Sequence, residues 1–439
     1  MTQSYVETFR KFSLNGAGGA GAPEWVRALR HVGLRRFVEL GFPSMKNEDW
    51  HFTSVAPIAD RDFTLLTAPS GDVRRADLEP FGFGSASDAW HTAVFVNGRF
   101  APEVSRLGRL PDGVRILPLT KGWTEAPELA RRVGTIASPE KATFTALNTA
   151  FMYDGAIVQI ADDTTVEQPI HLLFAADRHG ANAVWHPRNL VVAGRNAKAA
   201  VIESYVALTD MAYFTNAVTE VAVGEGATLT HYKLQREAIK AFHVGTIEAV
   251  QAKDSHYQSF SFAVGGDLSR TNIATLLDGE GCGATLNGLY MLDGAQHCDH
   301  QTRIEHAQPN CFSREVYIGI LDGRSHGVFN GKVYVRPIAQ KTDGKQTNKN
   351  LLLSEHAQVD TKPQLEIFAD DVKCTHGATV GQIDQTALFY MKSRGLGADE
   401  ARRLLTYAFA AGVLETIEVQ AVKEGLEAMA LARYAGAGE

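Results

Sequence analysis

Two metal-binding residue types lie close together in the run Cys374-Thr375-His376. Residues two apart on a strand share a face, so this thiol and this imidazole could reach the same ion. Thiolate and imidazole are both good ligands for transition metals. A single Cys-x-His pair is a weak signal, however, and a buried cysteine beside a hydrogen-bonded histidine explains these residues equally well.

A second group of metal-binding residue types is denser but less suited to one ion. It comprises His297, Cys298, Asp299 and His300, followed by His306 and Cys311. On a strand, His297 and Asp299 would share one face, and Cys298 and His300 the other. One zinc ion could not easily take all four, so we interpret this group as structural rungs or surface hydrogen bonding.

Two glycine-containing runs look superficially like nucleotide-binding loops. In Gly327-Val328-Phe329-Asn330-Gly331-Lys332-Val333, three residues separate the glycines instead of four, and Val333 occupies the position of the Mg²⁺-binding hydroxyl. The run Gly279-x-Gly281-x-Gly283 lacks a following helical pattern, so it is no dinucleotide fingerprint. The chain is therefore not expected to be an ATPase.

A hydrolase or lyase remains the main alternative among enzymes. Asp370 and Asp371 supply adjacent carboxylates, but neighbours on a strand would face opposite ways. Ser325 and His326 lack a nucleophile elbow. The alternative stays open as a carbohydrate-active β-helix enzyme.

The elements around these residues are short strands separated by Gly, Asp and Asn. The run 191–199 resembles 221–229 with an offset of 30 residues, and Gly226-Ala227-Thr228-Leu229 recurs at 283–286 with an offset of 57. Such periods are typical of solenoids or propellers. The alternation of Gln346, Asn348 and Asn350 with Thr347 and Lys349 predicts a strand with a polar face. We expect a right-handed parallel β-helix, with a β-propeller as the structural alternative.

Helical patterns are predicted at both ends of this region. Residues 24–40 form an apolar stripe that Pro23 opens and Gly41 stops, and Val94–Phe100 contains an Asn-Gly hairpin signal. Asp384 can cap a first C-terminal helix, and Asp399 and Glu400 favour the start of a second. The predicted organisation is a helical or mixed segment over 1–135, a β-helix core over 136–383 and a helical domain over 384–439.

Composition excludes several classes. The 439 residues carry a formal charge of −7 without a long basic run, which argues against nucleic-acid binding. No apolar run approaches the roughly 20 residues that a membrane span needs, and the N-terminus lacks a signal-peptide pattern. With no export signal, the four cysteines are expected to be thiols. We expect a cytoplasmic protein with no nucleic-acid or membrane partner.

Three long runs resemble the SufB/SufD family of iron–sulfur cluster assembly scaffolds, and more specifically its SufD branch. They are Leu321–Lys332, Ala339–Ser354 and Asp360–Gly381. Lys373–Thr379, with its Lys-Cys-Thr-His-Gly-Ala-Thr sequence, is the part that favours SufD over SufB. The similarity continues through 387–390 and 393–395, and is weaker at 43–50 and 144–148.

The resemblance implies a scaffold subunit without turnover of its own, which helps to build and transfer nascent clusters. It implies a complex with the paralogue SufB and the ABC-type ATPase SufC, so that ATP hydrolysis occurs in the partner. His376 matches a family histidine that helps to hold a transient cluster at the SufB–SufD interface, and Cys374 matches the neighbouring family cysteine. No permanently bound cofactor is implied. Thiolate and imidazole suit iron, and a pair completed by another chain suits a cluster that must leave.

The same resemblance places the ATPase on the C-terminal helices. The stripe expected to contact it is Leu404, Leu405, Ala408 and Phe409. A homodimer of the isolated chain is a further candidate assembly, and a stand-alone β-solenoid adaptor is a further alternative function. Two small departures from the family pattern, Gly344 for Ala and Thr375 for Ser, are expected to touch no proposed ligand.

Overall fold

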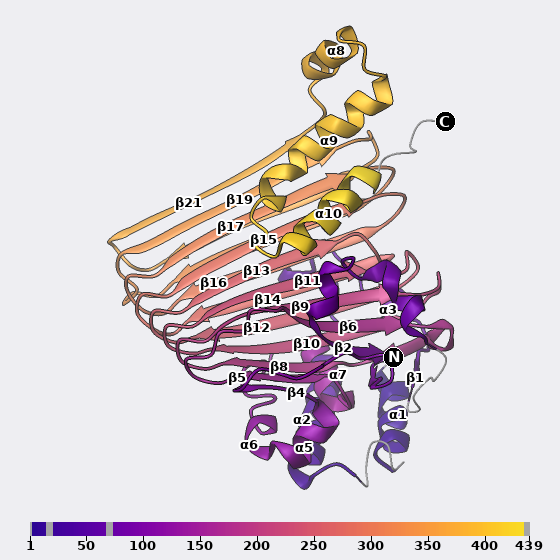
Figure 1. The fold of residues 1–439 in the computed structure, drawn as a ribbon, viewed down its shortest axis with the longest axis vertical. Coiled ribbons are helices and arrows are strands. Elements are labelled where there is room, and N and C mark those ends of the chain that lie inside the picture. Colours follow the sequence, from indigo (N-terminus) through magenta and orange to yellow (C-terminus); the bar gives the residue numbers. More distant parts are fainter. Residues whose placement is uncertain (1, 15–20, 67–72, 434–439) are drawn as a thin grey trace.

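The computed structural model describes residues 2–14, 21–66 and 73–433. Two long, mainly parallel sheets dominate it, and the chain alternates between them, so successive strands stack as the coils of a solenoid (Figure 1). This arrangement confirms the parallel β-solenoid and excludes the propeller. The right-handed winding of the solenoid stays a prediction.

One sheet holds mainly the even-numbered strands of the solenoid. Its members are β1 (Thr64–Leu65), β4 (Val114–Pro118), β5 (Ala156–Ile160), β7 (Ala183–Trp185), β8 (Arg188–Ala193), β10 (Phe214–Val223), β12 (Phe242–Gln251), β14 (Leu268–Leu277), β16 (His297–His306), β18 (His326–Val335) and β20 (Gln358–Ile367). We call it the even sheet.

The other sheet, the odd sheet, is built from the strands between them. Its members are β2 (His91–Val96), β3 (Arg99–Phe100), β6 (Ile170–Ala176), β9 (Lys198–Ala207), β11 (Thr228–Arg236), β13 (His256–Ala263), β15 (Gly283–Leu292), β17 (Phe312–Leu321), β19 (Thr342–Leu352) and β21 (Val372–Gly381). Because β2 and β4 belong to the two sheets, strand pairing begins before residue 136. The division of the chain into three domains stays a prediction.

Helices precede, interrupt and follow the strands. They are α1 (Thr2–Leu14), α2 (Glu24–Leu40), α3 (Ala56–Ala59), α4 (Arg75–Leu78), α5 (Leu119–Glu125), α6 (Pro127–Ala130), α7 (Thr143–Phe151), α8 (Gln385–Ser393), α9 (Ala398–Leu414) and α10 (Gln420–Arg433). The predicted helix over 24–40 is confirmed, as are the caps at Gly41 and Asp384. The predicted hairpin is confirmed too, with Asn97 and Gly98 at positive φ between β2 and β3.

The strand register tests the two sequence offsets. Residues of β8 and β9 pair with residues 30 positions later in β10 and β11, as predicted. The offset of 57 is wrong: Thr228 pairs with His256, which pairs with Gly283, an offset of 55. Coils differ in length, so a short sequence match can slip by two residues. A shift of two residues leaves every side chain on the same face of the sheet, so the predicted strands are correct although this offset is not.

Left-handed residues mark one corner of the solenoid on successive coils. Each has a positive φ in the turn before an odd-sheet strand: Asp163, Asn196, Gly226, Asp254, Gly281, Asn310 and Lys341. The backbone N–H of Gly226 donates to Lys253 O of the next coil at 2.9 Å, and Asp254 N–H donates to Glu280 O at 2.8 Å. Gly, Asn and Asp tolerate this conformation best, which explains why they punctuate the sequence.

The inner faces of the two sheets enclose a filled lumen. Ile273, Ile304 and Phe329 of the even sheet pack in one cluster with Tyr257 and Tyr317 of the odd sheet. Polar side chains also face this lumen, and the predicted polar face of β19 is confirmed: Gln346, Asn348 and Asn350 are 2%, 0% and 1% exposed. The amide nitrogens of all three donate hydrogen bonds, as in the contact from Asn350 Nδ2 to Asn348 Oδ1 at 2.6 Å.

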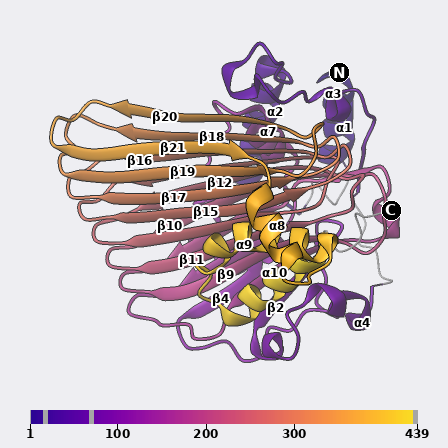
Figure 2. The ribbon, with the colours of Figure 1, turned by 90° about the horizontal axis from the view of Figure 1, so that it is seen from above.

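Helical segments pack on the outer face of each sheet, and the segment around α4 packs on β2, β6 and β9 of the odd sheet. N-terminal apolar side chains such as Phe37 and Phe151 pack against Phe214 and Phe242 of the even sheet. The C-terminal helices α9 and α10 lie along the odd sheet (Figure 2), where Val413, Leu414 and Leu426 join a cluster with strand residues including Ile318 and Ile320. Among the described helices, none is both long and apolar enough to cross a membrane.

Candidate functional site

The solenoid ends at β20 and β21, which are the last strands of their sheets (Figures 1 and 2). Within the described residues, each pairs with a strand on one side only. Lumen-facing positions that are buried in earlier coils are uncovered here. Whereas Gln346 and Asn348 are buried, His376 and Ala378, their partners on β21, are exposed. We call the lumen-facing residues of β20 and β21 the open end.

Cys374 lies at this open end, half-buried against Val333, Val335 and Ala339. Burial is the main cause that raises the pKa of its thiol, and the charge of Asp343 adds to this, while the Gly344 backbone lowers it. The net direction is upward, so the thiol is not activated within the isolated chain.

Gly344 was expected to touch no proposed ligand, and that prediction is wrong. Gly344 is the cross-strand partner of Cys374. A Cβ atom at position 344 would lie 3.3 Å from Cys374 Sγ, which is tighter than an ordinary van der Waals contact. Because the two residues are 30 positions apart in sequence, only the register brings them together.

His376 lies on β21 two residues after Cys374 and on the same, lumen-facing side of the sheet. Its partner on β19 is Gln346, which is buried, whereas His376 itself is exposed. The strand alternation that the sequence predicted for these two residues therefore holds, and the imidazole is accessible from outside the chain.

The two candidate ligands do not form a complete metal site. In the part of the chain that the structure describes, no group of three or more His, Cys, Asp or Glu side chains is placed to hold a metal ion. A tetrahedral metal site requires four donors, so any iron held here needs further ligands from elsewhere.

Exposed apolar side chains precede, lie on and follow strand β21. Exposed fractions are 57% for Phe368 in the turn between β20 and β21, 48% for Val380 on β21, and 73% and 58% for Phe389 and Tyr390 on α8. No residue of α8 is buried, and the helix projects past the last strands (Figure 1). Exposed apolar groups along and at both ends of an unpaired edge strand are typical of a protein interface.

The side chains of His297–His300 in the denser group are buried or engaged within the protein, in agreement with the structural interpretation. His297 and Asp299 face outward and both contact Thr53 Oγ1, at 2.9 Å and 2.6 Å. Cys298 and His300 face the lumen, and each is 1% exposed. Burial raises the pKa of the Cys298 thiol to about 12 and lowers the pKa of His300 to about 3, so both are neutral.

The other motifs also receive structural explanations. The Gly327–Lys332 run lies within strand β18 and forms no phosphate loop. His326 Nε2 contacts Asp360 Oδ2 at 2.7 Å, while Ser325 Oγ donates to Asp322 O, so these two residues form no nucleophilic pair. Asp370 and Asp371 were treated as strand neighbours, but they lie in the exposed turn between β20 and β21.

The C-terminal stripe is only partly accessible. Leu404 is 37% exposed and Ala408 is exposed, whereas Leu405 and Phe409 are half-buried. Phe409 packs against the cluster that joins α9 to the odd sheet. The surface available to a partner on α9 is therefore centred on Leu404 and Ala408.

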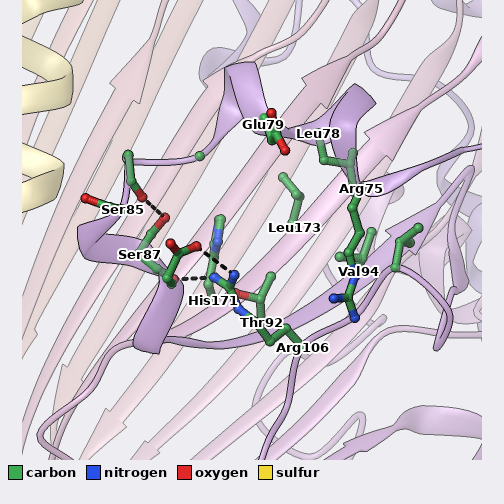
Figure 3. Close-up of a pocket in the computed structure, with 14 residues that line it drawn as sticks. Arg75, Leu78, Glu79, Ser85, Ser87, Thr92, Val94, Arg106, His171 and Leu173 are labelled. Carbon is green, nitrogen blue, oxygen red and sulfur yellow. Dashed lines mark hydrogen bonds and ion pairs between the residues drawn. The ribbon is translucent and has the colours of Figure 1, made fainter.

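A cleft of about 450 Å³ lies far from the open end in the chain order, between the segment around α4 and strands β2 and β6 (Figure 3). Its two arginines are engaged within the protein. Arg75 Nη2 donates to Ser105 O at 3.1 Å, and Arg106 Nη1 donates to Asp88 Oδ1 at 2.9 Å. Neither Cys374 nor His376 lines this cleft.

Comparison with known proteins decides the family. A family model described as "SUF system FeS cluster assembly, SufBD core domain" matches residues 174–409, and a "SufBD protein N-terminal region" model matches residues 1–172. The chain belongs to the SufBD family. This confirms the resemblance seen in the sequence motifs. It also confirms the expected function of the chain in iron–sulfur cluster assembly.

Curated relatives agree with this membership. A SufBD family protein of Synechocystis sp. is 35% identical over 88% of this chain and 86% of its own length. The iron–sulfur cluster assembly protein SufD of Escherichia coli is 32% identical over 91% of this chain and 90% of its own length. SufD of Bacillus subtilis is 25% identical over 92% of this chain. The chain is thus a SufD homologue, as Lys373–Thr379 indicated.

Proposed function

We propose that this SufBD family member is a non-catalytic scaffold subunit that presents His376, and more weakly Cys374, to a nascent iron–sulfur cluster. The cluster is cargo: it is assembled at the open end and then transferred. The observation that carries the proposal is the position of these two residues on the uncovered face of the last strand, beside an unpaired sheet edge.

An incomplete ligand set suits this role. Two donors from one chain cannot hold a cluster alone, so release requires only that the partner's donors move away. Cys374 is the weaker candidate, because burial raises the pKa of its thiol and iron binds the thiolate. A metal or a neighbouring cation from a partner would reverse that shift.

The proposed partner at this end is a SufB-like paralogue. The free edges of β20 and β21 can pair with strands of a second solenoid, since main-chain hydrogen bonding at a sheet edge is a general mode of association. Phe368, Val380 and Phe389 would be buried by such pairing. A homodimer through the same edges is the corresponding proposal for the isolated chain.

The proposed partner at the C-terminal helices is a SufC-like ABC ATPase. Leu404 and Ala408 offer an apolar surface that the solenoid does not cover, with Leu405 and Phe409 beneath it. ATP hydrolysis then occurs in that subunit, and its conformational changes act on this chain through α9. A cytoplasmic location is proposed for the whole complex.

Co-expression of the chain with SufB-like and SufC-like partners tests the proposal. The purified complex is reconstituted anaerobically with iron and sulfide, and cluster formation is followed by absorbance and iron content. His376→Ala is expected to leave the complex intact and to reduce cluster yield severalfold. His356→Ala, a change at another exposed histidine, is the matched control and should form clusters normally.

Each outcome decides a part of the proposal. A normal cluster yield from the His376→Ala complex would remove His376 from the site. Ala408→Asp should abolish co-purification of the ATPase, whereas the same change at exposed Ala428 on α10 should not. If no partner co-purifies and no iron is bound, the scaffold proposal is wrong and the stand-alone adaptor is favoured.

A further inference from the structure

Three side chains form a column that leads from the interior to the open end. Glu315 on β17 pairs with Gln346 on β19, which pairs with His376 on β21, and all three face the lumen. Neighbouring strands are about 4.8 Å apart, so the column rises by one side chain per coil. Glu315 and Gln346 are 1% and 2% exposed, and His376 ends the column in solvent.

The contact between the two buried members fixes the direction of the Gln346 amide. Gln346 Nε2 donates a hydrogen bond to Glu315 Oε2 at 2.5 Å. Because the amide nitrogen is the atom bonded to Glu315, the amide oxygen Oε1 remains available as an acceptor for another group. In the described structure this oxygen is buried and accepts no hydrogen bond. A buried acceptor without a donor is costly, so this atom calls for a partner.

Gly331 on β18 makes room for this arrangement from the opposite sheet. A Cβ atom at position 331 would lie 2.1 Å from Gln346 Nε2, so no larger residue fits without moving the amide. This explains one glycine of the Gly327–Lys332 run, which binds no phosphate. The lumen is narrow here, and the amide is held between Gly331 and Glu315.

We propose that Glu315 and Gln346 are positioning residues for His376: Gln346 Oε1 accepts a hydrogen bond from one ring N–H of His376, which leaves the other ring nitrogen unprotonated and directed at the metal. The inference rests on the proposed role of His376 as a cluster ligand. Metal-binding histidines generally donate their second ring N–H to a carboxylate or carbonyl, and losing that partner costs about 10-fold or more in metal affinity. Here the accepting carbonyl is that of the Gln346 amide, which Glu315 on the preceding coil orients.

The test is NMR of the full-length chain with ¹⁵N-labelled histidine, in mildly alkaline buffer. The His376 signal is assigned by its loss in His376→Ala. A ring N–H bonded to Gln346 exchanges slowly with water and gives a ¹H–¹⁵N peak from a single tautomer. In Gln346→Leu this peak is expected to disappear, because the acceptor is gone while the volume is kept.

Two further variants separate positioning from packing. Asn348 is a buried neighbour on the same face of β19, but it pairs with Ala378, so Asn348→Leu should leave the His376 peak unchanged. The double exchange Glu315→Gln with Gln346→Glu keeps one donor and one acceptor between the pair and leaves an oxygen facing His376. This exchange should restore the peak that Gln346→Leu loses.

The outcomes also separate this inference from the proposed function. A His376 ring N–H that is equally labile in wild type and Gln346→Leu overturns the positioning role, whatever the cluster assay shows. Loss of the peak in Asn348→Leu would assign the effect to general packing and overturn it as well. A normal cluster yield in His376→Ala would instead overturn the proposed function while leaving the hydrogen bond itself established.

Discussion

Gly344 and Cys374 are cross-strand partners at the last coil. Because glycine has no side chain, the Cys374 thiol is only half-buried. A Cβ at 344 would lie 3.3 Å from Cys374 Sγ and 3.4 Å from Ser313 Oγ. These contacts are tight without being prohibitive, and Gly344 does not have a positive φ. A methyl group is therefore tolerated here but covers the sulfur.

The first prediction follows from this contact. Gly344→Ala should slow alkylation of Cys374 by iodoacetamide severalfold, because the added methyl group shields the sulfur. It should destabilise the fold by about 1 kcal/mol, the lower end of what an overpacking change costs, because the new contacts are tight without being prohibitive. Lys345→Ala, on the opposite face of the same strand, is the control and should leave the rate unchanged. Equal rates in all three proteins would contradict the assigned contact.

The second prediction concerns the number of reactive thiols. Cys282, Cys298 and Cys311 are buried, and Cys374 is half-buried. Intact-mass analysis should therefore find one adduct per native chain and four per unfolded chain. Because burial raises the pKa of Cys374, its rate should be below that of free cysteine at neutral pH and should still increase in mildly alkaline buffer. Rapid labelling of two or more thiols in the native chain would argue against this packing.

The third prediction is a pH dependence that arises from Glu315. Burial raises the pKa of this carboxyl from 4.5 to about 7 in the folded chain, although the nearby Thr302 hydroxyl and the hydrogen bond from Gln346 oppose the shift. The folded state thus binds the proton more tightly than the unfolded state. The contribution of Glu315 to the free energy of unfolding is therefore fully present below pH 4.5. It falls by about 3 kcal/mol as the pH rises from there through about 7.

Glu315→Gln removes the titrating group and keeps its shape. Urea unfolding should show little difference from wild type near pH 4.5 and a more stable variant above pH 7.5. Glu400→Gln, an exposed change on α9, is the control and should follow the wild-type pH profile. A constant difference between Glu315→Gln and wild type at all pH values would mean that Glu315 does not titrate as inferred.

The fourth prediction concerns a buried ion pair that secures the segment before the solenoid core. Arg188 Nη2 and Glu220 Oε1 are 2.7 Å apart, and both side chains are fully buried. Glu220 also accepts backbone hydrogen bonds from Gly134, Ile136 and Ala137. Glu220→Gln leaves the guanidinium without its counter-charge and should destabilise the fold by about 3 kcal/mol. Glu225→Gln, at an exposed turn, should change urea stability little, and equal effects of the two changes would refute the assigned importance of the pair.

Much of the fold could be predicted because it depends on local patterns. The alternation of Gln346, Asn348 and Asn350 reflects the two-residue repeat of any strand, and the turn residues reflect the few side chains that accept a positive φ. The same holds for the helix over 24–40 and the cap at Asp384. These features depend on neighbours in sequence, so the sequence was sufficient to identify them.

The motifs also identified the family, and with it the candidate ligands Cys374 and His376. They could not show that Gly344 borders Cys374, that Gln346 lies beneath His376, or that Gly331 makes room for Gln346. Each of these pairs depends on the register between coils or on contact across the lumen. Coil lengths vary, as the error in the longer repeat offset shows, so sequence spacing alone does not determine which residues meet.

The sequence by itself therefore determined the strand periodicity, the helical ends, the family and the two residues with ligand chemistry. Only the tertiary structure decided that these two residues lie on the uncovered face of the last coil, while three other cysteines and the His297 group are buried or engaged elsewhere. The physical reason is that solvent access and hydrogen-bond partners depend on where the stacking of coils stops. That is a property of the assembled sheets, which no local run of residues specifies.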